Sequence, residues 1–95
     1  MKYYFDKAKN EILRRTRGAS FYDVIEAIAE KGVLLDIGHP NREKYPNQSM
    51  LVVEYNNYTW CIPYERKKET LHLITLFPNR DYLYLLKEGN NNGKD

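Results

Sequence analysis

Cysteine is almost absent from this sequence, and no stretch is hydrophobic enough to cross a membrane. Among the 95 residues only Cys61 is a cysteine, which excludes an internal disulfide and a cysteine-rich zinc site and is typical of a reducing compartment. No apolar run approaches the roughly 20 residues that a membrane-spanning helix needs. The sequence also lacks a glycine-rich phosphate loop and the His, Asp or Glu spacing of a metal site. We therefore expect a cytoplasmic protein that uses no metal, no cofactor and no membrane.

The composition that remains is that of one globular domain. Hydrophobic residues make up 42% of the chain and charged residues 29%, which lies in the range of folded soluble domains. The net charge of +2 says little, but residues 1–18 hold six basic and two acidic side chains, a local charge of +4. We expect a single domain over residues 1–88 and a flexible tail, rich in Gly and Asn, over residues 89–95.

Two amphipathic helices are predicted in the first third of the chain. Asp6 is a suitable N-cap for the first helix, and Gly18 is a suitable end. Ser20 and Asp23 resemble a capping box at the start of the second helix, which Gly32 closes. The helical spacing of the first helix predicts a buried stripe formed by Phe5, Ala8, Ile12 and Thr16. On the other side of the helix it predicts a basic stripe formed by Lys7, Asn10, Arg14 and Arg17.

The hydrophobic period then changes from that of helices to that of strands. Asn56-Asn57 is a plausible hairpin turn, and Pro63 predicts an edge position or a bulge because it has no N–H group. The predicted strands cover residues 33–37, 50–55, 58–64 and 70–77, and a short helix covers 79–86. Together these elements predict an α+β fold. Two N-terminal helices pack on one face of a three- to four-stranded antiparallel sheet, followed by a short C-terminal helix.

The two helix starts carry a resemblance to a known family. Phe5-Asp6-Lys7-Ala8-Lys9 and, twelve residues after Asp6, Gly18-Ala19-Ser20-Phe21 resemble the BrnT-type toxins of bacterial type II toxin–antitoxin systems, a branch of the RelE-like ribonuclease superfamily. The likeness in layout extends over roughly residues 3–80. It implies a RelE/BrnT-like fold and a metal-independent endoribonuclease toxin that cleaves RNA through its 2′-OH and inhibits growth. It also implies a cognate antitoxin, typically a ribbon-helix-helix DNA-binding protein. The chain would then bind operator DNA only through this antitoxin.

The sequence also departs from that family pattern. Leu13 stands where the family has Asn, and Thr16-Arg17 stands where it has Lys-His. The family's last strand commonly ends in Ser-x-Arg and then an acidic residue, whereas Thr75 and Arg80 are more widely spaced, with Phe77-Pro78-Asn79 between them, and no acidic residue stands at the family's spacing. A second reading therefore stays open, namely a catalytically inactive regulatory module that binds an antitoxin-like partner or nucleic acid.

Metal-free RNA cleavage needs a base, an acid and cations. The sequence offers His39, Arg42, Lys44, Tyr45, Tyr64, Arg66, His72 and Arg80. We select His39, Arg80, Lys44 and Tyr64 as catalytic candidates, and Lys7, Arg14, Arg17, Arg42 and Arg66 as RNA-binding candidates. The alternatives are a loop histidine without a role, a packed tyrosine and solvated surface charges. We expect the loop 38–48 and Arg80 to meet at the same end of the sheet.

Overall fold

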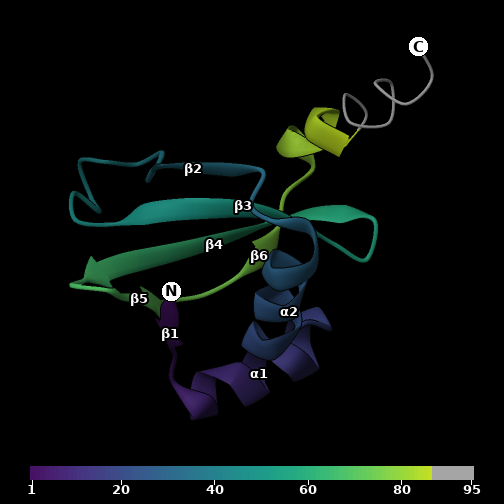
Figure 1. Ribbon diagram of the computed structural model, residues 1–95, viewed down its shortest axis with the longest axis horizontal. Helices are drawn as coiled ribbons and strands as arrows, with labels where there is room; N and C mark the ends of the chain where they lie inside the picture. Colours follow the sequence, from purple (N-terminus) through teal and green to yellow (C-terminus); the bar gives the residue numbers. More distant parts are fainter. Residues whose placement is uncertain (87–95) are drawn as a thin grey trace.

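Two helices and a mixed six-stranded sheet form residues 1–86, the part of the chain that the computed structural model describes. The expected tail, residues 89–95, lies outside the described residues. The elements are β1 (Lys2–Tyr4), α1 (Lys7–Arg17), α2 (Phe21–Lys31), β2 (Leu35–Gly38), β3 (Ser49–Tyr55), β4 (Tyr58–Lys67), β5 (Thr70–Leu73), β6 (Phe77–Pro78) and a 3₁₀ helix (Arg80–Tyr82) (Figure 1).

The helix ends confirm the capping residues that the sequence indicates. The Asp6 carboxylate accepts two backbone N–H groups from the first turn of α1, at 2.8 and 3.2 Å. Gly18 ends α1 with a φ of 72°, in the left-handed region that glycine adopts without strain. At the start of α2, Ser20 and Asp23 form the complete capping box, with reciprocal bonds of 3.1 and 2.9 Å. Both helices therefore start and stop through local chemistry.

The predicted orientation of α1 is wrong. Ile12, expected to be buried, is 48% exposed, whereas Leu13 is 2% exposed and belongs to the core. Asn10, expected on the basic stripe, is buried, and its side-chain oxygen accepts the backbone N–H of Phe21 at 2.7 Å. Because this amide satisfies a free N–H at the start of α2, it turns the face of Asn10 and Leu13 inward.

The expectation of three or four antiparallel strands is also wrong. The strand order is β1-β5-β4-β3-β2, and β6 pairs with β4 as a third partner, beyond β5 along the same edge. β1 pairs in parallel with β5, with Tyr3 opposite Leu71, so the sheet is mixed. The sequence did not predict β1, because three residues are too few to show an alternating pattern.

A β-bulge separates β5 from β6. Tyr64 of β4 pairs with Leu73, but Cys61 pairs with Phe77, so three steps along β4 match four steps along its partner. The extra residue lies among residues 74–76, which face Ile62 and Pro63, and the Pro63 carbonyl accepts the backbone N–H of Ile74 at 2.9 Å. Pro63 therefore lies beside a bulge, one of the two positions that the sequence indicates. Because one inserted residue reverses the side-chain alternation, Phe77 faces away from the helices.

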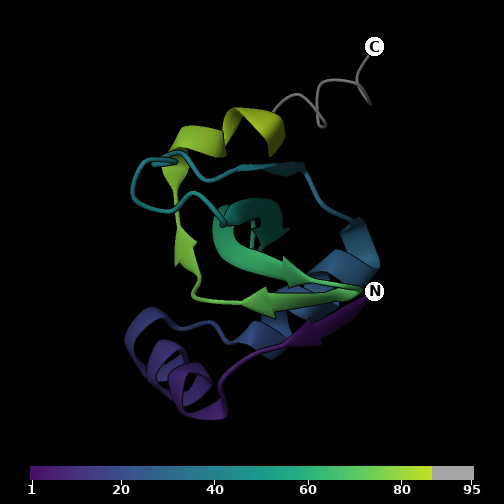
Figure 2. The same cartoon turned by 90° about the vertical axis from the view of Figure 1, so that its left-hand side faces the viewer.

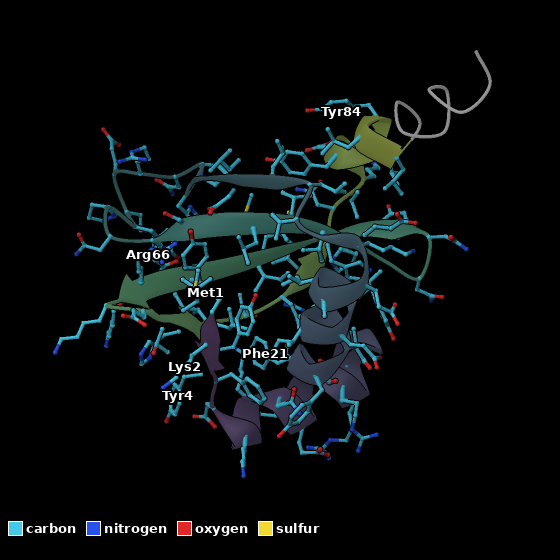
Figure 3. The ribbon with its side chains drawn as sticks, in the orientation of Figure 1. Met1, Lys2, Tyr4, Phe21, Arg66 and Tyr84 are labelled. Atoms are coloured by element: carbon cyan, nitrogen blue, oxygen red, sulfur yellow. The ribbon has the colours of Figure 1, made fainter. Side chains whose placement is uncertain are left out.

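Each face of the sheet is covered by a different layer. On the helix side, Phe21, Val24 and Leu13 pack on alternating residues of the central strands, among them Val53, Trp60 and Ile62. Figure 2 shows the curled sheet with the helices below it and the yellow C-terminal segment above it. Figure 3 shows Phe21 beside α2 and Tyr84 on the opposite side of the molecule.

The second face of the sheet is covered in part by the C-terminal segment. Met50, Val52 and Cys61 are at most 2% exposed, and Tyr82 and Leu85 of the C-terminal segment pack against them. This cover extends over β2, β3 and the first half of β4. It leaves open the other half of the same face, formed by β1, β5 and the end of β4.

Candidate functional site on the second sheet face

His39 follows β2 and lines a pocket on the second face of the sheet. The ring is half-buried, and its centroid lies 4.6 Å from that of Tyr45. Its Nδ1 accepts the backbone N–H of Asn41 at 3.0 Å. Pro63 and Phe77, which point away from the helices, line the same pocket of about 330 Å³. His39 is therefore placed at an accessible hollow, as a functional residue needs to be.

Arg80 lies at the other end of the sheet, contrary to our expectation. The residue before it, Asn79, donates its backbone N–H to Thr59 near the start of β4. The loop that begins at His39 instead lies at the level of Tyr64, where β2 and β3 meet. Five residues of strand separate these two levels, or about 17 Å. Figure 1 shows the loop at the left and the 3₁₀ helix at the right, so Arg80 and His39 do not form one site.

Tyr64 belongs to the packed core on the helix side. It is 4% exposed, and its hydroxyl donates to the Asp36 carboxylate at 2.7 Å. Burial, followed by the bond to Asp36, raises the pKa of Tyr64 above its ordinary value. Its neighbour Pro63 lines the His39 pocket, and adjacent strand residues point to opposite faces. Tyr64 and His39 are thus on opposite sides of the sheet.

Arg42 and Lys44 both belong to the loop that begins at His39. Lys44 is exposed and holds its ammonium 5.4 Å from the centre of the Tyr45 ring. The Arg42 guanidinium lies directly over the α-carbon of Gly38, in the space that a β-carbon would occupy. Lys44 and Arg42 can therefore contribute positive charge beside the His39 pocket.

The remaining RNA-binding candidates lie on the helix side or at its edge. Lys7 and Arg14 are exposed on α1, where Arg14 forms an ion pair with Glu11 at 2.8 Å. Arg17 donates to the Leu76 carbonyl in the bulge. Arg66 lines a separate pocket of about 340 Å³ with Met1, Lys2, Lys68 and Glu69, and Figure 3 shows it near Met1. The predicted stripe does not form a continuous cationic surface.

A different cluster emerges on the open half of the second face. Glu65 of β4 pairs directly with His72 of β5, and His72 pairs with Tyr4 of β1. The Tyr4 and His72 ring centroids are 5.0 Å apart. Directly opposed residues place their β-carbons about 4.5–5.5 Å apart. A carboxylate, an imidazole and a phenol therefore lie in one row across three strands.

Two lysines flank this row. Lys67 lies two residues beyond Glu65, and Lys2 lies two residues before Tyr4, so both share the face of the row. Thr70 pairs with both lysines across the sheet. Lys2 and Lys67 are exposed, and within residues 1–86 neither they nor Glu65 form an ion pair. The row therefore combines proton-transfer groups with free cations.

This cluster continues into the His39 pocket. Pro63 precedes Glu65 by two residues and Ile74 follows His72 by two, so these pocket-lining residues lie on the same face. Gln48, another lining residue, accepts the backbone N–H of His39 at 3.1 Å. The row of Tyr4, His72 and Glu65, its flanking lysines and the His39 pocket thus form one surface, the His72 face.

Sequence reasoning named His72 but did not connect it with Glu65 or Tyr4. The pairing of Glu65 with His72 needs the register of β4 and β5, which their charged turn does not specify. Tyr4 and Lys2 reach the cluster only through the parallel strand β1, which the sequence did not predict. Alternation along β5 was the available signal, since Leu71 and Leu73 are buried and His72 between them is not.

The described residues were also searched for metal-binding clusters and membrane-spanning helices, and the chain was compared with known proteins. Within residues 1–86, no three His, Cys, Asp or Glu side chains are grouped as metal ligands would be. No helix in this range is long and apolar enough to span a membrane. Comparison with protein-family models, with curated proteins and with solved structures found no match to this chain.

Proposed function

We propose that this chain is a metal-independent endoribonuclease toxin that cleaves RNA at the His72 face. The observation that supports this proposal is the cross-strand pair of Glu65 and His72 on an open sheet face, between the free lysines Lys2 and Lys67. RNA carries its own nucleophile, so cleavage needs only a base, an acid and positive charge near the phosphate. The His72 face offers all three.

Each group has a defined role in this reaction. The Glu65 carboxylate takes the proton of the 2′-OH, whose oxygen forms a bond to the adjacent phosphorus. The bond from phosphorus to the 5′-oxygen breaks, and the protonated His72 ring gives its proton to that oxygen. Lys2 and Lys67 stabilise the charge on the phosphate. The products are a 2′,3′-cyclic phosphate and a 5′-hydroxyl end.

The biological role follows from the sequence resemblance to BrnT-type toxins. An RNA-cleaving chain arrests growth until a partner blocks it, and an antitoxin that covers the His72 face would block it by occlusion. Exposed lysines at the rim favour an acidic partner segment, whose binding weakens with salt. Operator DNA would be reached through that partner.

Cleavage by purified protein tests this function. Single-stranded RNA is incubated with the protein in the presence of a chelator, and the ends of the products are identified. Glu65→Gln and His72→Asn should each lower the rate by about 10²–10⁴-fold. Glu69→Gln, in the neighbouring exposed turn, is the matched control and should leave the rate unchanged. RNA that stays intact, or equal rates in all variants, would count against the proposal.

A second candidate is a regulatory module that binds RNA or an antitoxin-like partner without cutting. The wide separation of Arg80 from His39 favours this reading, since Arg80 matches the terminal arginine of the family in type. Binding of RNA without cleavage, reduced by Lys2→Ala and Lys67→Ala, would support it.

A further inference from the structure

The pocket beside His39 is built by a folded loop and by the bulge. Three backbone hydrogen bonds of 3.0 to 3.2 Å fix the loop, from His39 to Gln48, from Tyr45 to Asn41 and from Gln48 to Tyr45. Phe77 forms part of the pocket because the bulge turns it to this face. A pocket that is formed before a ligand arrives binds without the cost of ordering its walls.

The walls offer flat apolar surface. Tyr45 and Phe77 contribute aromatic rings, and Pro63 and Ile74 contribute aliphatic surface. Its volume of about 330 Å³ is at the lower end of small-ligand pockets, which run from about 300 to 1,000 Å³. The pocket is therefore suited to one flat ring system.

His39 is a fixed hydrogen-bond donor in this pocket. Its Nδ1 accepts the backbone N–H of Asn41, so the neutral ring carries its proton on Nε2. A proton on Nδ1 would point at that same N–H and break the bond. His39 is thereby suited to donate to a ligand, and less suited to exchange protons as a catalytic base or acid.

Two further polar residues, Gln48 and Thr75, line the pocket, and their side chains have no hydrogen-bond partner within residues 1–86. Gln48 brings both a donor and an acceptor, and Thr75 brings a hydroxyl that serves as either. With His39, these groups can recognise the polar edge of a ring.

We propose that this pocket binds a single nucleobase of a single-stranded RNA substrate. The proposal rests on the function proposed above and names how that substrate is recognised. Glu65 lies two residues from Pro63, or about 7 Å along β4, so a base in the pocket places its own phosphate near the reacting groups. Lys44 adds positive charge at the pocket rim. Stacking of a base on aromatic side chains is a common mode of single-strand recognition.

The donor at His39 does not by itself select among bases. Its Nε2–H can bond to a carbonyl oxygen of guanine, uracil or cytosine and equally to a ring nitrogen of adenine. The pocket should therefore accept all four bases.

Mononucleotide binding tests the pocket independently of cleavage. The four nucleoside 3′-monophosphates are titrated into the full chain, and binding is followed by calorimetry and by NMR shifts. Saturable binding is expected for each. Thr75→Val and Gln48→Met keep the side-chain shapes and should weaken binding at least tenfold, whereas Thr16→Val on the exposed surface of α1 should not. Circular dichroism confirms that each variant is folded.

The results separate the pocket from the proposed function. Nucleotide binding that depends on Thr75 and Gln48 supports the pocket even if the chain cleaves no RNA, an outcome that would overturn only the ribonuclease proposal. If the chain cleaves RNA, and Thr75→Val and Gln48→Met change neither its nucleotide binding nor its base preference, the pocket proposal is overturned and the ribonuclease proposal stands. Absence of nucleotide binding, with a partner peptide protecting the pocket instead, would also overturn it.

Discussion

The guanidinium of Arg17 donates a hydrogen bond to the backbone carbonyl of Leu76, joining the last turn of α1 to the bulge between β5 and β6. Bulges interrupt the regular ladder and leave backbone groups without strand partners. Leu76 is fully buried, so an unpaired carbonyl at this position would be costly. Arg17 therefore satisfies the backbone at the point where the chain turns Phe77 into the pocket.

Removal of the Arg17 side chain should destabilise the fold more than it weakens RNA binding. Hydrogen bonds from charged groups contribute about 1.5–3 kcal/mol, so Arg17→Ala should lower the free energy of unfolding by about that amount. Urea denaturation measures the change. Arg15→Ala, on the exposed surface of the same helix, is the control and should have little effect. If Arg17→Ala keeps normal stability but binds RNA more weakly, Arg17 is an RNA-binding residue and this prediction is wrong.

Tyr64 should contribute to stability and not to catalysis. Tyr64→Phe removes only the hydroxyl that donates to Asp36 and should cost about 1 kcal/mol of unfolding free energy. RNA cleavage should be unchanged, because Tyr64 faces the helices and not the His72 face. Tyr22→Phe is a suitable control, since Tyr22 is 58% exposed. A large loss of cleavage in Tyr64→Phe at unchanged stability would contradict this assignment.

Local features of the fold could be predicted from the sequence because they depend on neighbouring residues. Asp6, Gly18 and the Ser20–Asp23 box act within one helical turn. The Asn56-Asn57 turn has φ values of 57° and 61°, the left-handed conformation that asparagine tolerates.

Features that depend on contacts between distant segments could not be predicted in this way. The orientation of α1 depends on the bond from Phe21 to Asn10, which the helical pattern alone does not contain. The site depends on strand register, which brings Tyr4 and Glu65 to His72 across two ladders. The expectation that Arg80 lies near His39 was wrong for the same reason. The bulge after β5 and the pairing of β6 with the first half of β4 decide which end of the sheet Arg80 reaches.

Alkaline pH should destabilise the fold through its buried thiol and its buried and half-buried phenols. Burial raises the pKa of Cys61 from 9.0 to about 11, and burial is also the main cause of the raised pKa of Tyr55, Tyr64 and Tyr82. In the unfolded chain these groups release protons at their ordinary, lower pKa values. Above about pH 9 the unfolded chain therefore binds fewer protons than the folded one, and the free energy of unfolding falls as the pH rises.

Urea midpoints measured between about pH 8 and pH 11 test this linkage, because stability is expected to be constant at the lower limit and to decline toward the upper one. Cys61→Ala should be less stable throughout, since it leaves a cavity, but its decline above about pH 9 should be shallower. Within the wild type, Cys61 should react slowly with thiol reagents at neutral pH, because it is fully buried and its pKa is raised. A midpoint that stays constant to about pH 11, or an equally steep decline in Cys61→Ala, would show that Cys61 does not contribute to the pH dependence.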